Sequence, residues 1–200
     1  MFDEAPHSQF SPAAKPPSRH QPHQNYSPDR WQQAKNITLM DVKTDWDKIR
    51  KHFNKSFSSN FYVSIASIDS ENNPTVTPIG SLFLNDNQTG FYFEKFPTKL
   101  PEHSKSNPKV CLLGVNSGRI FWIKSLFKEK FTDFPAIKLY GELGEKRKTT
   151  EMEIFRLNRR MKITNGLKGN TYLWKKMEFV RETKFTKAEK INLGKITAEL

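Results

Sequence analysis

The chain has 200 residues, 36% of them hydrophobic, a formal net charge of +12 and a single cysteine, which excludes an intramolecular disulfide and a zinc site built from several cysteines. No stretch approaches the roughly 20 apolar residues that a membrane-spanning helix needs, and the N-terminal segment lacks the apolar core of a secretory signal. We therefore expect a cytoplasmic protein with no membrane partner.

Residues 1–36 differ in composition from the rest of the chain. They hold six of the twelve prolines and three of the five histidines, with almost no aliphatic residues. Such a segment cannot bury enough apolar surface to offset the entropy that is lost on ordering. The composition predicts a disordered tail over 1–36, whose histidines are not expected to bind a metal, and one domain over 37–200.

The basic excess is concentrated in the C-terminal part of the chain. Residues 119–200 carry 20 basic and 10 acidic side chains. Such a field favours anionic partners, which include a phosphorylated cofactor, a nucleic acid or an acidic surface. It also favours solubility, so the charge does not choose among these roles.

The first predicted element is a helix over 44–55, because Val42, Trp46, Ile49 and Phe53 recur at helical spacing. Thr44 is expected to be its N-cap, with Asp47 three residues later. Strands are predicted over 61–68, 75–84 and 91–94, joined by tight turns into an antiparallel meander. The later elements are a short helix over 98–106, a strand over 109–115, an irregular segment over 119–134, a strand over 137–145, a helix over 150–161, a strand over 172–182 and a short strand over 190–193.

Many strands with few helices between them favour a closed or semi-closed barrel. Pro78 lies inside the second predicted strand, and a proline there marks an edge or a bulge because it cannot donate to a strand ladder. In the predicted helix over 150–161, Thr150 and Glu153 form a capping box. Arg156, Arg159 and Arg160 share one face of that helix, which predicts either a solvated face or a nucleic-acid surface.

Two regions of the sequence resemble the pyridoxamine 5′-phosphate oxidase-like proteins, the FMN-binding split barrels. The first is the run from Phe91 to Lys99 followed by Asn107-Pro108-Lys109-Val110, which resembles the aromatic strand, loop, helix and next strand of that family. The second is the hairpin formed by 65–69 and 73–80. The strand Ile137-x-Leu139-x-Gly141-Glu142-Leu143 is also similar to a later family strand with a central glycine.

The resemblance implies a mainly β fold, a six-stranded antiparallel split β-barrel with flanking helices, that forms a homodimer with FMN at the subunit interface. It implies that backbone groups of Val76, Thr77, Pro78, Ile79 and Gly80 contact the flavin ring, and that Thr98 and Lys99 hold the phosphate. Thr98 and Lys99 also begin a predicted helix, where phosphate groups commonly bind. His103, one helical turn after Lys99, is expected either to face the same phosphate or to be solvated.

Two departures from the family pattern bear on the activity. Thr98 stands where the vitamin B6 enzyme has an arginine, and residues 194–200 do not match the segment that grips the pyridoxal substrate there. Both argue against pyridoxamine phosphate oxidase activity itself. Because the family also includes deazaflavin-dependent reductases and haem-handling proteins, deazaflavin and haem stay open as alternative cofactors.

Aromatic and basic residues alternate over 119–134, where Phe121 and Trp122 lie. They are interpreted as the wall of a substrate pocket over the flavin, as a platform for single-stranded nucleic acid, or as packing residues of the core or the dimer interface. The sequence thus predicts an FMN-dependent oxidoreductase acting on a small-molecule substrate, with no catalytic side chain nominated. The alternatives are a non-catalytic flavin- or haem-binding protein and a nucleic-acid-associated protein.

Overall fold

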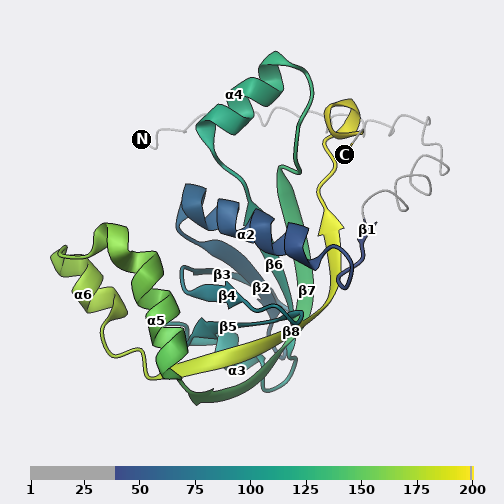
Figure 1. Cartoon of the computed structure of the whole chain (residues 1–200). Coiled ribbons are helices and arrows are strands. Elements are labelled where there is room, and N and C mark those ends of the chain that lie inside the picture. The colour runs from purple at the N-terminus through teal and green to yellow at the C-terminus, as the bar shows by residue number, and fades with distance from the viewer. Residues whose placement is uncertain (1–38, 199) are drawn as a thin grey trace, which may run out of the picture.

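Eight antiparallel strands form one sheet in the computed structural model, which describes residues 39–198 and 200 (Figure 1). The strand order is β3-β2-β6-β7-β8-β5-β4, and β1 pairs with β8. The strands are β1 (Leu39–Met40), β2 (Val63–Ile68), β3 (Pro74–Ile79), β4 (Leu82–Leu84), β5 (Thr89–Phe93), β6 (Lys109–Val115), β7 (Ala136–Lys148) and β8 (Phe179–Lys190).

The ends of this order are β3 and β4, which do not pair with each other, so the sheet is an open half-barrel. This architecture is consistent with the expected split barrel and confirms the mainly β fold class. The described part of the chain has eight strands rather than six, because the predicted strand over 75–84 is divided and the two-residue β1 is added at the edge of β8. The tail predicted over 1–36 lies outside the described residues.

Helices flank the sheet on several sides (Figure 1). They are α2 (Trp46–Asn60), α3 (Lys99–His103), α4 (Arg119–Phe127), α5 (Glu151–Arg160) and α6 (Lys168–Trp174), with short 3-10 turns at Met161–Thr164 and Gly194–Thr197. In Figure 1, α2 lies across the sheet, α4 stands at one end, and α5 and α6 lie together on one side. Within the described range, no helix is long and apolar enough to span a membrane.

The helix α2 begins and ends later than its sequence predicts. Thr44 is not the N-cap; that residue is Asp45, whose side chain makes no capping hydrogen bond. Asp41 instead accepts hydrogen bonds from the backbone N–H groups of Lys43 and Thr44, so the residues before the helix form a turn. The helix continues to Asn60 because Ser56 and Phe57 extend its buried face.

The predicted meander is wrong, although its two hairpins exist. β2 pairs with β3 and β4 pairs with β5, but the chain leaves one hairpin at Gly80-Ser81 and begins the other at the opposite end of the strand order. The alternation of apolar residues within a segment predicts that the segment is a strand. It does not predict that β6, β7 and β8 lie between the two hairpins in the sheet. Pro78 does lie on an edge strand, as its lack of an N–H predicts.

Two segments form helices where their sequence predicts other structure. Residues 119–127 form α4 rather than an irregular segment, because the exposed face of this helix is also apolar and therefore hides the helical period. Residues 168–174 form α6, so the predicted strand over 172–182 begins only at Phe179, and β8 continues to Lys190. No separate strand follows near 190–193 in the described chain.

The core is divided into two clusters by the sheet. The larger cluster lies under α2 and includes Trp46, Ile49 and Phe53. The smaller cluster joins α5 to β4, β5 and β8 and consists of Phe83, Phe91, Phe93, Leu157, Met177 and Val180. The second cluster therefore fixes α5 and α6 over the strands that end the sheet at β4.

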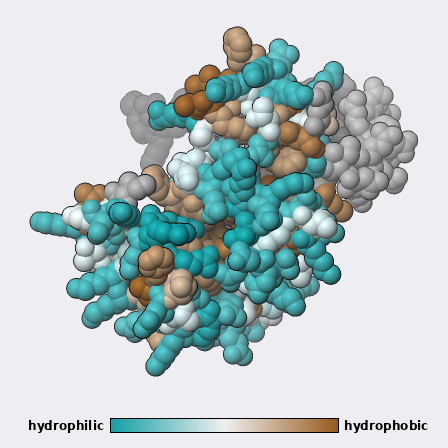
Figure 2. All heavy atoms as spheres, in the orientation of Figure 1, coloured by the Kyte–Doolittle hydropathy of each residue, from teal (hydrophilic) through white to brown (hydrophobic). Residues whose placement is uncertain are grey.

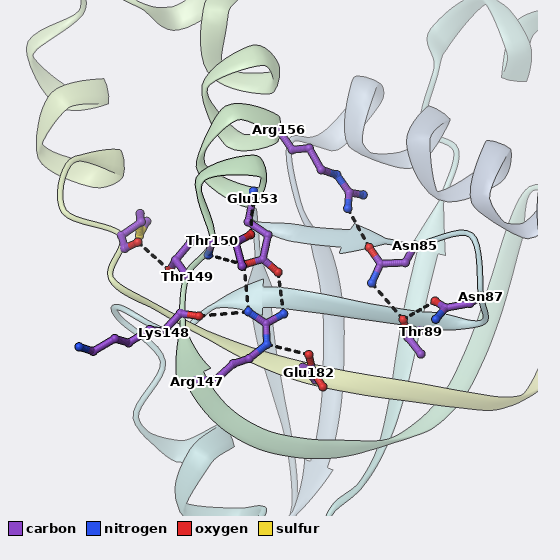
Figure 3. Close-up of polar contacts among 11 residues, drawn as sticks. Asn85, Asn87, Thr89, Arg147, Lys148, Thr149, Thr150, Glu153, Arg156 and Glu182 are labelled. Atoms are coloured by element: carbon purple, nitrogen blue, oxygen red, sulfur yellow. Dashed lines mark hydrogen bonds and ion pairs between the residues drawn. The ribbon is translucent and has the colours of Figure 1, made fainter.

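The N-terminus of α5 is fixed by the capping box that the sequence predicts. Thr150 Oγ1 accepts from the backbone N–H of Glu153 at 3.3 Å, and Glu153 Oε2 accepts from the N–H of Thr150 at 2.9 Å. The Glu153 carboxylate also receives two bonds from Arg147 of β7, at 2.7 and 3.0 Å (Figure 3). Arg147 donates in turn to Glu182 of β8 at 2.7 Å, so one guanidinium joins α5 to two strands.

Candidate functional site

The strand β3 is an edge strand that is hydrogen-bonded on one side, to β2. Val76 is 65% exposed and Pro78 is exposed, whereas Thr77 is half-buried between them. The first part of the expected ring-contacting segment therefore presents open surface. Ile79, at the end of the strand, is buried in the core.

Gly80 is covered by the neighbouring helix α6. A Cβ atom added at Gly80 would lie 3.2 Å from the carbonyl oxygen of Phe61 and 3.3 Å from the indole ring of Trp174. The space above this glycine is thus occupied by a side chain of α6. The five residues expected to contact the ring are divided between the stretch 76–78, in which Val76 and Pro78 are exposed, and a covered end at Ile79 and Gly80.

The helix α3 begins where the sequence predicts. Thr98 is its N-cap and Lys99 its first residue, and both are exposed. The Lys99 ammonium lies 3.6 Å from the carboxylate of Glu102, with both side chains well exposed. A solvent-exposed pair of this kind contributes little, so an anionic ligand can displace Glu102 at low cost.

His103 occupies a position that neither sequence expectation describes. Its side chain is 5% exposed, and its Nδ1 lies 3.0 Å from Ser67 Oγ and 3.4 Å from Thr75 Oγ1. It is neither solvated nor turned toward a phosphate at Lys99. These contacts attach α3 to β2 and β3, so the helix that carries Thr98 and Lys99 lies against the hairpin that carries the 76–80 segment.

The loop between β5 and α3 is attached to α6 by a lysine that the sequence did not single out. Lys95 Nζ donates to the backbone carbonyls of Tyr172 at 2.9 Å and Lys175 at 2.8 Å, at the C-terminal end of α6. Cations interact favourably with the carbonyls at a helix C-terminus. Tyr172 and Trp174 are aromatic residues, which favour strands, so the sequence predicts a strand where the structure has the end of α6.

An ion cluster fixes the strand end that precedes this loop. The carboxylate of Glu94, whose side chain is nearly buried, accepts from Arg181 Nε and lies 3.4 Å from the ammonium of Lys146. Tyr92 Oη donates to the same carboxylate at 3.3 Å, and burial together with the Glu94 charge raises the pKa of that phenol. The cluster holds β5, β7 and β8 together and leaves Tyr92 a hydrogen-bond donor.

Phe121 and Trp122 lie on α4 and pack against Phe131. The ring centroids are 5.3 Å apart for Phe121 and Phe131 and 5.2 Å apart for Trp122 and Phe131. Trp122 Nε1 also donates to the carbonyl of Asn116 at 2.6 Å. Figure 1 shows α4 and α3 at opposite ends of the molecule, so one chain does not bring these aromatic residues to the β3–α3 edge.

The outer face of α4 is apolar. Ile120, Ile123, Leu126 and Phe127 are all exposed, Phe127 by 90%. Figure 2 shows apolar atoms gathered at the same end of the molecule as α4 in Figure 1. A nine-residue helix that exposes four large apolar side chains is typical of an interaction surface rather than of a solvated one.

Titratable groups elsewhere suggest little further chemistry. Burial raises the pKa of the half-buried Cys111 thiol, which keeps it protonated and poorly nucleophilic. Among residues 39–198 and 200, no cluster of histidine, cysteine, aspartate and glutamate side chains has the arrangement of a metal site.

Comparison with known proteins gives matches among solved structures alone. No protein-family model and no curated protein sequence matches the chain. Among solved structures, an FMN-binding protein from Syntrophomonas wolfei is similar at 16% identity and a TM-score of 0.49, over 76% of this chain and 95% of that one. The open antiparallel sheet with flanking helices is consistent with the split barrel that the sequence motifs predict.

Two further solved structures are similar to this chain. A protein of Listeria innocua described as a candidate pyridoxamine 5′-phosphate oxidase has 14% identity and a TM-score of 0.46, over 73% of this chain and 97% of that one. HutZ, the haem storage protein of Vibrio cholerae, has 11% identity and a TM-score of 0.43, over 76% of this chain and 92% of that one.

Proposed function

We propose that this chain is a cytoplasmic FMN-binding flavoprotein and an FMN-dependent oxidoreductase that acts as a homodimer on a small-molecule substrate. The observation that carries the proposal is the attachment of α3 to the β2–β3 hairpin through His103, Ser67 and Thr75. It sets the two groups of residues that the sequence motifs assign to the flavin, 76–80 and 98–99, on neighbouring elements.

The residues present fit FMN in part. Val76, Thr77 and Pro78 lie on a strand whose free edge leaves backbone groups available to a flat ring. Thr98 offers a hydroxyl and Lys99 an ammonium that pairs with the exposed carboxylate of Glu102, which suits a phosphate monoester. Because Ile79 is buried and Gly80 is covered by Trp174, ring contacts are expected at 76–78 rather than along all five residues.

Bound FMN would supply hydride or electron transfer. The chain would then act through binding and electrostatics. Lys99 and Thr98 would hold the phosphate, backbone groups at 76–78 would orient the ring, and the basic C-terminal part of the chain would favour negative charge on the ring. His103 would act as a positioning residue, because it fixes α3 rather than facing the ligand.

The homodimer is supported by the apolar face of α4. This helix also carries the exposed cations Arg119 and Lys124, whereas Glu71 and Glu102 are exposed on the β2–β3 turn and on α3. Packing α4 of one subunit on the β3–α3 edge of the other would bury apolar area and pair opposite charges. In that arrangement Ile123 and Phe127 would face the partner, whereas Phe121 and Trp122 pack against Phe131 of their own chain, so the substrate-pocket role of these two aromatic residues stays a prediction.

The test compares FMN with riboflavin, which has the same ring but no phosphate. Lys99→Ala is expected to weaken FMN binding about 10- to 150-fold, the loss of one charge-assisted hydrogen bond, and to leave the weaker riboflavin affinity nearly unchanged. Lys105→Ala, just beyond the same helix, is the matched control and should change neither affinity. FMN affinity within a factor of two of the parent, or an equal loss for riboflavin, would contradict the assignment of Lys99.

The absorbance spectrum of the purified protein separates the alternatives. Flavin bands would support FMN, whereas a Soret band would favour a haem-binding protein and a deazaflavin spectrum the related cofactor. Thermal unfolding with excess ligand supplies a second readout, since a ligand at a hundred times its Kd adds about 2.7 kcal/mol of stability. A melting temperature that responds to neither FMN nor deazaflavin would rule out the flavin function.

A further inference from the structure

Two arginines of α5 lie against the edge strand β4 and, among the residues that the structure describes, donate only to neutral acceptors. Arg160 Nη1 donates to the carbonyl of Leu82 at 2.5 Å, and Arg156 Nη2 donates to the carbonyl of Leu84 at 3.0 Å. Arg156 Nη1 also donates to Asn85 Oδ1 at 2.7 Å, where Figure 3 shows it projecting from α5 toward the β4–β5 turn. The sequence-based expectation that these two arginines belong to a solvated helix face is therefore wrong.

The flat faces of both guanidinium groups are covered by aromatic rings. The Arg160 guanidinium carbon lies 3.6 Å from the ring centroid of Phe83 and 4.4 Å from that of Phe57. That of Arg156 lies 5.1 Å from the centroids of Phe83 and Phe91. A guanidinium has more N–H donors than these few bonds use, and both side chains are half-buried rather than buried, so part of each side chain reaches the surface.

The charge of the pair is not compensated within the described part of the chain. No carboxylate there forms an ion pair with Arg156 or Arg160. Two carboxylates, Asp86 and Glu153, favour the charged form of Arg156 from a distance. Each is already paired with another arginine: Asp86 with Arg50 at 2.6 Å, and Glu153 with Arg147 at 2.7 Å.

Other cations lie near the Arg156 guanidinium. Burial, and then the positive charges of Arg50 and Arg159, lower the pKa of Arg156. Burial, followed by the nearby charge of Arg156, lowers the pKa of Arg160 to about 9, which still leaves it charged at neutral pH. Desolvating like charges without a counter-ion is unfavourable, and a bound anion would offset that cost.

We propose that Arg156 and Arg160 form a binding site for the phosphoryl group of a small phosphorylated ligand. A phosphoryl group presents several acceptor oxygens and up to two negative charges, and the free edges of guanidinium groups bind it through paired hydrogen bonds. The site lies on α5 and β4, apart from the residues of β3 and α3 proposed for FMN. Its two arginines, each with its faces covered, suit a single anionic group better than the extended phosphate track of a nucleic acid.

The proposal is tested by titrating inorganic phosphate into the full-length protein in a calorimeter, at constant ionic strength set with chloride. The parent is expected to bind one phosphate per chain saturably. Arg160→Met and Arg156→Met, which keep an unbranched side chain between the rings, should each weaken binding by about tenfold or more. Arg119→Met, which removes one exposed arginine from α4, should leave the affinity within a factor of two.

Three results would overturn the proposal. The first is an absence of saturable phosphate binding by the parent, which needs no variant to fold. The second is an Arg160→Met protein that loses affinity for FMN but not for riboflavin, which would assign the arginines to the phosphate of the cofactor instead. The third is displacement of phosphate by a single-stranded oligonucleotide that binds with a steep salt dependence, which would indicate a nucleic-acid surface.

Discussion

The guanidinium of Arg160 stacks on Phe83, with 3.6 Å between its carbon and the ring centroid, while it donates to the carbonyl of the preceding residue, Leu82. Arg156, four residues earlier on α5, makes the equivalent bond to Leu84, two residues later on β4. Side chains one helical turn apart and backbone groups two strand residues apart are both separated by about 6 Å. The helix therefore covers successive free carbonyls of an edge strand, which would otherwise be open to pairing with another chain.

Arg160→Ala is expected to lower the free energy of unfolding by about 2–4 kcal/mol. The change removes a desolvated cation–π contact, worth about 2 kcal/mol, and a charged hydrogen bond to Leu82, worth about 1.5–3 kcal/mol, while relieving part of the cost of burying the charge. Urea unfolding measures the difference. Arg159→Ala, on the exposed side of the same helix, is the control and should stay within about 0.5 kcal/mol of the parent. Equal effects of the two substitutions would mean that the contact with Phe83 and Leu82 does not stabilise the fold.

His52 is expected to make stability decline on the acidic side of neutrality. Its Nε2 donates to the carbonyl of Gly114 at 2.9 Å, while its buried Nδ1 has no hydrogen-bond partner among the described residues, and burial lowers the pKa of this imidazole. The native state therefore holds His52 neutral, whereas the unfolded chain takes up a proton below its ordinary pKa of about 6.5. Stability is complete above that pH and falls below it, by at most about 1.4 kcal/mol per pH unit for this one proton.

The measurement is urea unfolding of the parent and of His52→Gln at pH 7.5 and 5.5. Glutamine can still donate to Gly114 but does not titrate in this range. The variant should lose less stability between the two pH values than the parent does. An unchanged pH dependence would place the titrating group elsewhere.

Glu153→Gln is expected to destabilise the protein by about 2 kcal/mol. Burial alone would raise the pKa of Glu153, but the bonds from Arg147 and Thr150 outweigh it and lower that pKa. The substitution leaves Arg147 without one of its two carboxylates and weakens the capping box. Because the pKa is lowered in the folded state, this contribution is present above the ordinary glutamate pKa and is lost as the pH falls below it.

The check is the free energy of unfolding of Glu153→Gln at pH 7 and pH 3.5. The difference from the parent should shrink at the lower pH, because the carboxylate is protonated in the unfolded parent chain at a higher pH than in the folded one. Glu151→Gln, an exposed residue of the same first turn, serves as the control. A difference that stays constant with pH would show that charge at Glu153 contributes nothing.

The double substitution Ile123→Ser, Phe127→Ser is expected to convert the proposed dimer into a monomer. Both side chains are exposed on α4, so the fold of the single chain loses little when they change. Sedimentation equilibrium measures the association, and Met152→Ser, an exposed apolar residue of α5, is the matched control. A parent protein that is monomeric at micromolar concentration, or a double variant that still dimerises, would remove α4 from the interface.

Several elements could be predicted from local sequence because local sequence decides them. The strand over 109–115 has the bounds that its apolar run predicts, and the capping box at Thr150 and Glu153 is present. α3 begins at Thr98 and Lys99 as expected. In each case the relevant interactions join residues close in the chain, or the hydrophobic period is visible because one face alone is apolar.

The candidate site depends on contacts that no local pattern contains. The motif residues indicated which segments to compare with a flavin site, but not that His103 would be buried against Ser67 and Thr75, or that Trp174 would cover Gly80. α4 escaped prediction because its outward face is as apolar as its inward one. Arg156 and Arg160 looked solvated because charged residues usually are.

Four properties of this protein follow from local sequence alone. They are the β-rich domain, the N-terminal cap of α5, the edge strand that contains Pro78, and the basic C-terminal half. The strand order that separates the two hairpins, the helix that covers Gly80, and the placement of two arginines on β4 arise from packing between distant residues. Gly80 and Trp174 are 94 positions apart in the chain, and Leu82 and Arg160 are 78 apart. These long-range contacts depend on the free energy of the whole fold rather than on the propensity of any one segment, because each of them forms only when many others form with it.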